Sequence, residues 1–319
     1  MNGFPRGEPV LVTGHTGFTG RHMVDYLLRL PRRPKLVGLA RRAESDCTVD
    51  EQVVADLRQS EVVRQALLAC RPEVIVHLAG SLPPAGHAEL WDNNVLTTEA
   101  LLAAVRSCPE LRPRVLAVGS AAEYGPADER LIDEQHPCAP TTAYGRAKLA
   151  ATSLCVRYAR EYGLSVVVAR PFNLLGPGMT EHSVVGTLCA QLVSPEGGGR
   201  VELGNLNSSR DFVDVGDAVA AYWALARLGR AGEVYNVCSG RAVTVRELID
   251  LAASVSGRAV HLRSVSERHQ IGDVEYSCGS YAKLEELTGW RPRRELATSI
   301  ADVLADFQRR LGCPAESGG

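Results

Sequence analysis

The stretch Val10-Leu11-Val12-Thr13-Gly14-His15-Thr16-Gly17-Phe18-Thr19-Gly20 decides the fold of this 319-residue chain. A short apolar run ends there in glycines at positions 14, 17 and 20, and a helical pattern follows over 23–28. The first glycine permits a tight turn, the second lets the backbone approach a pyrophosphate, and the third lets the helix pack closely. A helix N-terminus behind such a turn offers free N–H groups to phosphates. The stretch therefore predicts a strand–turn–helix unit that binds a dinucleotide.

Apolar runs and helical patterns continue to alternate through the first 170 residues. The unbroken apolar runs are typical of strands buried on both faces of a parallel sheet. Their alternation with helices predicts an α/β fold with a doubly wound, Rossmann-type sheet. We expect strands at 10–13, 35–40, 53–55, 74–78, 115–119 and 166–169, and helices at 23–28, 61–70, 93–107 and 143–162.

The pattern changes after Arg170, where prolines and the glycine run 197–199 interrupt the chain. Later elements look mostly helical, over 215–228, 245–256 and 297–311, and Thr244 with Glu247 forms a capping box before the second of them. We expect a dinucleotide-binding domain over 1–172, to which 206–242 returns. A smaller, mostly helical substrate domain is expected over 173–205 and 243–312, followed by a tail over 313–319.

The amino-acid composition argues against several classes of function. The chain has 35 Lys and Arg against 37 Asp and Glu, a net charge of −2, and 5% aromatic residues, which disfavours nucleic acid and polybasic membrane binding. No apolar run reaches the roughly 18–20 residues that span a bilayer, and we expect a cytoplasmic protein. The nine cysteines form no CxxC pair, so we expect free thiols and no metal site.

The end of the second expected strand bears on the choice of cofactor. A site for NAD usually carries Asp or Glu there to hold the ribose hydroxyls, whereas this chain has Arg41 and Arg42, which suit a 2′-phosphate. The pattern favours NADP, with NAD as second choice, although two solvated arginines would look the same. Asp56, after the third strand, is a candidate acceptor for the adenine amino group, and a plain surface acid is an equal alternative.

Three residues form a candidate catalytic group. Tyr144 and Lys148 are four positions apart, which places them on one face of a helix. A neighbouring ammonium is expected to lower the pKa of the phenol, so that Tyr144 exchanges a proton with a carbinol oxygen. Ser120 follows the strand 115–119 at the carboxyl edge of the sheet, where its hydroxyl would hold a carbonyl oxygen.

Together with the glycine turn, these residues resemble the extended short-chain dehydrogenase/reductase family, also called the NAD-dependent epimerase/dehydratase family, whose members act on nucleotide sugars. The resemblance covers nearly the whole chain and implies catalytic roles for Ser120, Tyr144 and Lys148. The other matching segments are 56–58, 77–80, 94–95, 170–173, 176–178, 210–215 and 288–292. The implied cofactor-binding residues are Gly14, Thr16, Gly17, Phe18, Thr19, Gly20, Arg41, Arg42, Asp56, Leu57, Leu78, Ala79, Gly80, Asn94, Tyr144, Lys148 and Pro171.

Within the family, segments 119–125, 170–178, 201–206 and 234–240 look like those of the GDP-4-keto-6-deoxy-D-mannose reductases. Two segments depart from the family pattern. Gln270 stands where an arginine often grips phosphate, and the loop after Gly80 is short, so the sugar need not be the namesake's. The candidate substrate contacts are Ser81, Ser120, Ala121, Asn173, His182, Arg210 and Asp273.

The residues after Ser120 bear on the type of reaction. Family dehydratases carry an acid and a base at the two positions occupied here by Ala121 and Ala122, and Glu123 is one residue too late. Dehydration is therefore disfavoured. We expect NADPH-dependent reduction of the C4 ketone of a 4-keto-6-deoxy sugar nucleotide, GDP-linked in the first instance, with Tyr144 as general acid. An NAD-dependent 4-epimerase and a non-catalytic dinucleotide sensor remain as alternatives.

The resemblance also implies an assembly. Family members commonly dimerise through two helices per subunit, which here would be 94–107 and 143–162. The expected partners are therefore a nucleotide-sugar substrate and a second copy of the chain.

Overall fold

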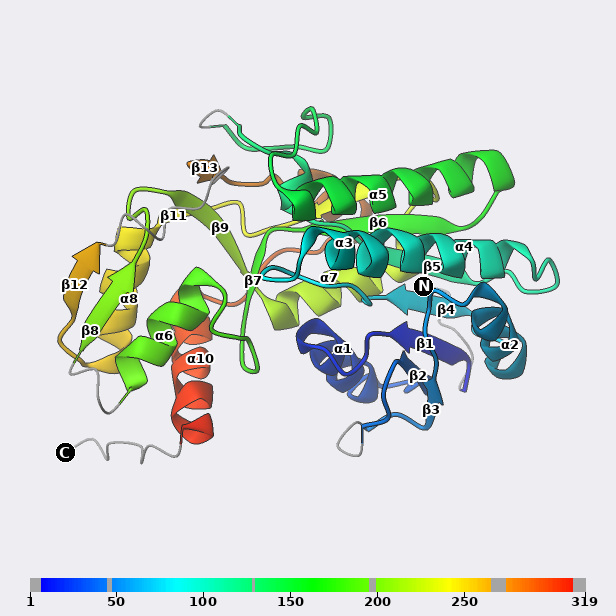
Figure 1. The fold of residues 1–319 in the computed structure, drawn as a ribbon, viewed down its shortest axis with the longest axis horizontal. Helices are drawn as coiled ribbons and strands as arrows, with labels where there is room; N and C mark the ends of the chain where they lie inside the picture. The colour runs from blue at the N-terminus through cyan, green and yellow to red at the C-terminus, as the bar shows by residue number, and fades with distance from the viewer. Residues whose placement is uncertain (1–6, 45–47, 128–129, 195–198, 265–273, 312–319) are drawn as a thin grey trace.

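The computed structural model describes residues 7–44, 48–127, 130–194, 199–264 and 274–311 (Figure 1). Its centre is a seven-stranded, wholly parallel sheet in the order β10-β6-β5-β4-β1-β2-β3. The strands are β1 (Pro9–Thr13), β2 (Lys35–Ala40), β3 (Glu51–Val54), β4 (Val74–His77), β5 (Arg114–Val118), β6 (Val166–Pro171) and β10 (Val234–Val237). The predicted Rossmann-type sheet is confirmed.

Helices cover both faces of this sheet. One face carries α1 (Phe18–Leu28) and α7 (Val215–Leu228), and the other carries α2 (Ser60–Cys70), α4 (Thr97–Arg106) and α5 (Ala143–Tyr162). Successive residues of β1 point into opposite layers: Val10 and Val12 pack with α1 and α7, whereas Leu11 packs with α2 and α4. Burial on both sides explains why these strands are apolar at every position.

The expected helix over 93–107 is interrupted. The chain forms α3 (His87–Trp91), then a π-helical turn at Asp92–Leu96, and only then α4. Thr97 and Thr98 each donate their hydroxyl to the carbonyl four residues earlier, at Asn93 and Asn94. π-helical turns often occur at functional sites, and this one borders the cavity described below.

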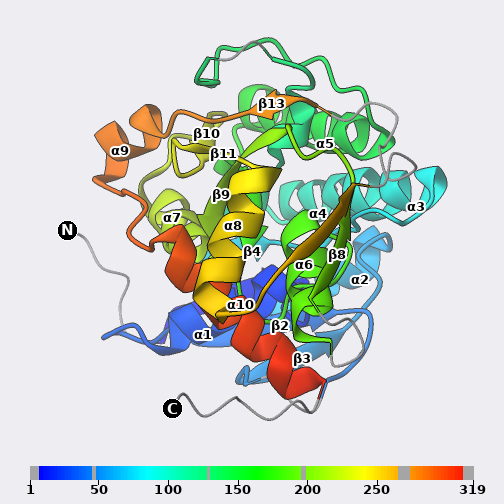
Figure 2. The ribbon, with the colours of Figure 1, turned by 90° about the vertical axis from the view of Figure 1, so that its left-hand side faces the viewer.

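A second hydrophobic core lies beyond the sheet, at the left of Figure 1 and facing the viewer in Figure 2. Three helices pack around it, α6 (Val184–Val193), α8 (Val245–Ser256) and α10 (Leu296–Arg310), while α9 (Ala282–Thr288) packs on α7. Short strands accompany them: β7 (Asn173–Leu175), β8 (Arg200–Leu203), β9 (Ser209–Asp214), β11 (Ala242–Thr244), β12 (His261–Ser264) and β13 (Tyr276–Ser277). The domain boundaries stay a prediction.

These short strands, and β10, were not expected as strands. The strands around the second core are two to six residues long and lack an apolar run. β10 contains Asn236, which reads as a turn residue but is fully buried. Its side-chain oxygen accepts from the Tyr124 hydroxyl at 2.7 Å and its amide donates to Ile132 O at 2.9 Å, so a long-range network stabilises a polar residue inside the sheet.

Asp211 joins the segments around β9. Its buried carboxylate accepts from the backbone and hydroxyl of Ser239, both at 2.7 Å, from Gly240 N at 2.9 Å and from Gly279 N at 3.2 Å. These donors lie in the turn after β10 and in the turn before α9. One side chain therefore fixes both turns against β9, the strand that also carries Arg210.

None of the helices in the described part of the chain combines the length and the apolar character that crossing a bilayer would require.

The Asp211 network gives a stability prediction. Asp211→Asn should lower the free energy of unfolding by about 3 kcal/mol, because either orientation of the amide sets an NH₂ group against a buried N–H donor. Urea unfolding followed by circular dichroism measures the change. Asp250→Asn, on an exposed position of α8, is the control and should change stability by less than about 0.5 kcal/mol. Equal losses in the two variants would contradict the role given to Asp211.

Candidate active site

The glycine turn connects β1 to α1 and approaches β4 closely. Gly14 has φ +68°, in the left-handed region, and a Cβ there would lie 2.8 Å from the backbone N and Cα of Ala79. A Cβ on Gly20 would lie 2.1 Å from the carbonyl oxygen of Gly14, so the third glycine lets the helix pack on the turn itself. A Cβ on Gly17 would make only an ordinary contact, at 3.4 Å from the same oxygen.

A cavity of about 190 Å³ lies beside this turn, at the carboxyl ends of β1, β2 and β4. Nine residues predicted to bind the cofactor line it: Gly14, Thr16, Gly17, Arg41, Asp56, Leu57, Leu78, Ala79 and Gly80. Five further residues line the cavity that were not predicted from the sequence: Leu39, Ala40, Ala55, Asn93 and Thr97. The first three follow from strand ends already recognised, but Asn93 and Thr97 face the cavity because of the π-helical turn, which no sequence pattern signalled.

Several predicted cofactor residues lie outside the lining of this cavity. Phe18 starts α1 and stacks edge-on against His22, with ring centroids 5.4 Å apart. Asn94 donates its amide to Ser81 O at 3.0 Å and to Leu90 O at 2.8 Å, so it braces the loop after β4. Arg42 is exposed beyond β2, Thr19 lies in the first turn of α1, and Pro171 is buried at the end of β6.

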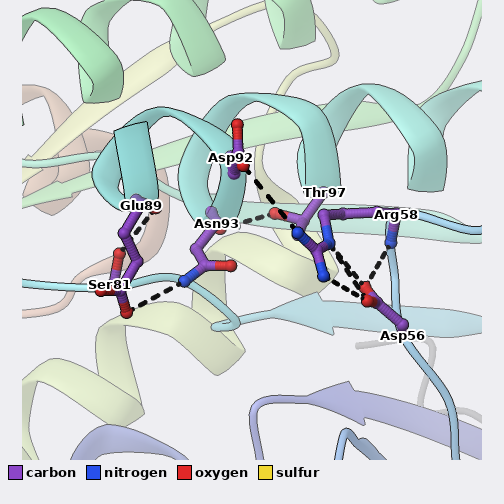
Figure 3. A network of polar contacts seen from close by, with 7 residues as sticks. All are labelled: Asp56, Arg58, Ser81, Glu89, Asp92, Asn93 and Thr97. Atoms are coloured by element: carbon purple, nitrogen blue, oxygen red, sulfur yellow. Dashed lines mark hydrogen bonds and ion pairs between the residues drawn. The ribbon is translucent and has the colours of Figure 1, made fainter. Parts of the chain in front are cut away.

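Figure 3 shows a polar network along the rim of the cavity, with Arg58 between Asp56 and Asp92. The Arg58 guanidinium binds both oxygens of Asp56 at 2.6–3.1 Å and lies 3.9 Å from the carboxylate of Asp92. Hydrogen bonds from Arg58 lower the pKa of Asp56 to about 2, so this carboxylate stays ionised and acts as an acceptor. The network links the loop after β3 to the π-helical turn.

Ser120 and Tyr144 come together at the carboxyl end of β5. Ser120 caps a short 3₁₀ helix at Ala121–Glu123, and the first turn of α5 lies directly against this helix. Gly145 permits the approach, since a Cβ there would lie 2.3 Å from Ala122 O. The Tyr144 phenol thereby comes close to the Ser120 side chain, and this proximity acts to lower the pKa of the phenol.

Lys148 lies one turn further along the same face of α5. Its ammonium donates to the carbonyl of Val118, the last residue of β5. The hydroxyl, the phenol and the ammonium therefore all lie at the carboxyl end of β5. Their catalytic roles remain a proposal.

The predicted effect of Lys148 on Tyr144 was wrong for this structure. Burial raises the pKa of Tyr144 to about 12, with the nearby Ser120 side chain acting in the opposite direction and the charge of Glu123 raising the pKa further. Lys148 does not offset these effects, and burial lowers its own pKa. At neutral pH the phenol is consequently protonated, which is the state that a proton donor needs.

Two histidines near the turn are structural. His77, at the end of β4, joins Thr13 Oγ1 at 2.8 Å and Thr98 Oγ1 at 3.1 Å, and burial lowers its pKa to about 3. His15 is 1% exposed and packs its ring against Gly38 of β2, with no hydrogen-bond partner for either ring nitrogen among the described residues. It therefore does not lie exposed in the turn.

The predicted substrate contacts lie on several separate segments, and those among the described residues are outside the lining of the cavity. Asn173 of β7 donates to Asp211 O at 2.8 Å, which places it on the strand beside the one that carries Arg210. Arg210 donates to Ser209 O and Glu275 O at 3.0 and 3.3 Å. Ser81 and Ala121 are half-buried, at the end of β4 and beside Ser120, whereas His182 is exposed before α6. Asp273 lies outside the described residues.

A second cavity, of about 260 Å³, lies at the opposite edge of the sheet, where Val10 and Val74 begin β1 and β4 and Trp223 closes one side. It is larger than the cavity beside the glycine turn. However, Ser120, Tyr144 and Lys148 are at the other ends of the strands, so we assign the candidate site to the smaller cavity.

Comparisons with known proteins identify the family of the chain and several similar proteins. Residues 10–238 match the family described as "NAD dependent epimerase/dehydratase family". The chain is 32% identical to GDP-6-deoxy-D-mannose reductase of Pseudomonas aeruginosa, over 95% of this chain and 98% of that one. It is 31% identical to dTDP-6-deoxy-L-talose 4-dehydrogenase (NAD(P)(+)) of Kitasatospora kifunensis, over 92% and 94%. The structure of RMD from Pseudomonas aeruginosa complexed with NADPH has a TM-score of 0.82 at 31% identity, over 95% and 98%.

Two glycine substitutions separate packing from cofactor binding. Gly20→Ala should lower the free energy of unfolding by about 2 kcal/mol, because its methyl group collides with the turn. Gly17→Ala should cost at most about 1 kcal/mol, yet weaken NADPH binding at least tenfold, or by about 1.4 kcal/mol, because its methyl group occupies the place of a phosphate. Urea unfolding and NADPH fluorescence titration measure the two effects. NADPH affinity unchanged in Gly17→Ala would contradict the assignment of the turn.

Proposed function

The chain belongs to the NAD dependent epimerase/dehydratase family, a family of nucleotide-sugar oxidoreductases that use a pyridine nucleotide, and from this we propose that it reduces the C4 ketone of a 4-keto-6-deoxy sugar nucleotide with NADPH. The observation that carries the proposal is that Tyr144, Ser120 and Lys148 meet at the carboxyl end of β5, the strand next to β4, after which the chain lines the cavity. The first relative is named a reductase of a GDP-linked 6-deoxy sugar, and the second a 4-dehydrogenase of a dTDP-linked one. We favour the GDP-linked substrate.

The structure fits a dinucleotide at the glycine turn. Gly17 leaves its Cα open to the cavity, and the N-terminus of α1 points its free N–H groups to the same place. Arg41 lines the cavity at the end of β2. The residues that would hold the cofactor are therefore those of the turn, the ends of β2 to β4, and Lys148 at the nicotinamide ribose. When bound, the nicotinamide supplies the hydride.

Two side chains of the protein orient the ketone and supply the proton that its oxygen receives. Ser120 donates a hydrogen bond to the ketone oxygen and so fixes the carbonyl. Tyr144, protonated at neutral pH because burial raises its pKa, gives its proton to the same oxygen as negative charge develops there. Arg210 contacts the diphosphate by charge-assisted hydrogen bonds, and Asn173 contacts the sugar nucleotide.

Two features favour reduction over the other reactions of the family. Ala121 and Ala122 have no group that moves a proton, which argues against elimination of water. A phenol whose pKa is raised by burial suits proton donation, the step that reduction of a ketone requires.

The charged residues after β2 favour NADPH over NADH. Arg41 and Arg42 are exposed at the end of β2, and the first acidic residue beyond them, Glu44, is paired with Arg21 at 2.7 Å. Two cations and an engaged carboxylate favour a 2′-phosphate over free ribose hydroxyls.

A second copy of the chain, packed on α4 and α5, is part of the same proposal. Two large apolar side chains are exposed next to α5, Trp91 at the end of α3 and Leu96 at the end of the π-helical turn.

The test of the function is direct. The purified protein, incubated with NADPH and 4-keto-6-deoxy sugars linked to GDP, dTDP, CDP or UDP, should consume the reduced nicotinamide with one series, most rapidly with GDP. Tyr144→Phe should lower the rate at least about 100-fold while NADPH still binds. The proposal fails if no series supports NADPH oxidation, or if the protein carries tightly bound NAD and interconverts two 4-hydroxy sugars without added reductant.

The cofactor preference has its own test. Arg41→Ala should weaken NADPH about tenfold or more and NADH less than about twofold, because only the phosphorylated ribose loses a charge-assisted hydrogen bond. Arg42→Ala is the matched comparison and should have the smaller effect, since Arg42 does not line the cavity. Fluorescence titration gives both dissociation constants. Equal weakening of NADPH and NADH in Arg41→Ala would contradict the proposed role of this residue.

A further inference from the structure

Glu123 is a fully buried carboxylate that the proposed reaction does not use. One of its oxygens, Oε1, accepts from the backbone N–H of Ser120 at 2.7 Å and from the Thr152 hydroxyl at 3.0 Å. The other, Oε2, accepts from Nη2 and Nε of Arg170 at 2.7 and 3.1 Å. The side chains of Glu123 and Arg170 are 0% and 4% exposed, so this is an ion pair without solvent.

The pair connects three elements that build the site. Ser120 follows β5, Thr152 lies in α5, and Arg170 lies in β6. The guanidinium also stacks on Tyr124, 4.4 Å from the ring centroid. Gly119 makes room for the carboxylate, because a Cβ there would lie 2.4 Å from Glu123 Oε1. Both oxygens of the buried carboxylate have hydrogen-bond or ion-pair partners, and these partners hold it in one position.

The position of the carboxylate relative to α5 is informative. Tyr144, Lys148 and Thr152 are spaced by four residues and share one face of the helix. Glu123 accepts a hydrogen bond from Thr152, the last of these three residues along α5. Its charge therefore lies beyond Lys148, on the helix face that also carries the Tyr144 phenol. We propose that Glu123 is a positioning residue. Its carboxylate fixes the backbone of Ser120 and places a negative charge near Tyr144 and Lys148.

The charged and titratable groups around this face are few. Ser120 and Glu123 face Tyr144 from the loop after β5, Lys148 lies on its own helix, and Tyr222 approaches from α7. Around Lys148 are Glu123, Cys155 of α5 and the neutral His77 of β4. Glu123 raises the pKa of both Tyr144 and Lys148, and so helps to keep the phenol protonated and the ammonium charged.

The inference rests on the proposed function only where it takes Tyr144 as the proton donor, so its test uses no substrate. The phenolate absorbance is measured after a stopped-flow jump to about pH 11, as the difference between each protein and its Tyr144→Phe counterpart. A pKa near 12 gives roughly one tenth ionisation at that pH. Because the charge of Glu123 raises this pKa and is the smallest of its causes, Glu123→Gln should ionise Tyr144 about twofold more than the wild-type protein.

Two further variants separate charge from folding. Glu123→Gln leaves Arg170 buried without a counter-charge and risks misfolding, whereas Glu123→Gln/Arg170→Met removes both charges and retains an amide oxygen for Ser120 N. The double variant should fold and show the same direction of change. Thr152→Val removes one hydrogen bond to Glu123 but no charge, and should leave the ionisation of Tyr144 as in the wild-type protein.

The outcomes are distinct. Increased phenolate in the double variant, with none in Thr152→Val, supports the inference even if no keto sugar is ever turned over. Unchanged phenolate in a folded Glu123→Gln/Arg170→Met protein overturns it, and so does an equal increase in Thr152→Val, because the effect would then come from loosened packing.

Discussion

The contact between the first turn of α5 and the 3₁₀ helix after β5 is the constraint on which the site depends. Gly145 makes it possible by leaving room for the carbonyl of Ala122. The contact brings Tyr144, from a helix, to Ser120, from a loop at the end of β5, and so assembles two elements that are distant along the chain. Lys148 then follows from helical spacing alone, because it lies one turn beyond Tyr144 on the same face.

Much of this arrangement could be predicted from the sequence because local patterns carry it. The central strands are buried on both faces, so β1 and β4 appear as unbroken apolar runs, and the glycine at 20 is required by its contact with the backbone of Gly14, six residues earlier. Parallel strands place their carboxyl ends at one edge, which brings Ser120 near the glycine turn without knowledge of distances. The family resemblance then supplied the roles.

What could not be predicted depends on contacts between distant segments. Asn236 lies inside β10 because Tyr124 and Ile132 satisfy its amide, and nothing near it in the sequence indicates a strand. Asn93 faces the cavity through a π-helical turn. The pKa of Tyr144 was misjudged because spacing shows that Lys148 is near, whereas the burial of the phenol and the charge of Glu123 become visible only in three dimensions.

At the carboxyl end of β5 the protein holds a buried, protonated phenol close to the Ser120 hydroxyl, and we propose that both act on a ketone. Transfer of the cofactor's deuterium tests this most directly. With NADPH that carries deuterium at the transferred position, and a GDP-linked 4-keto-6-deoxy sugar, the product should contain one deuterium, at C4 of the sugar, by mass spectrometry and NMR. A product without deuterium, or with deuterium at another carbon, would contradict the account.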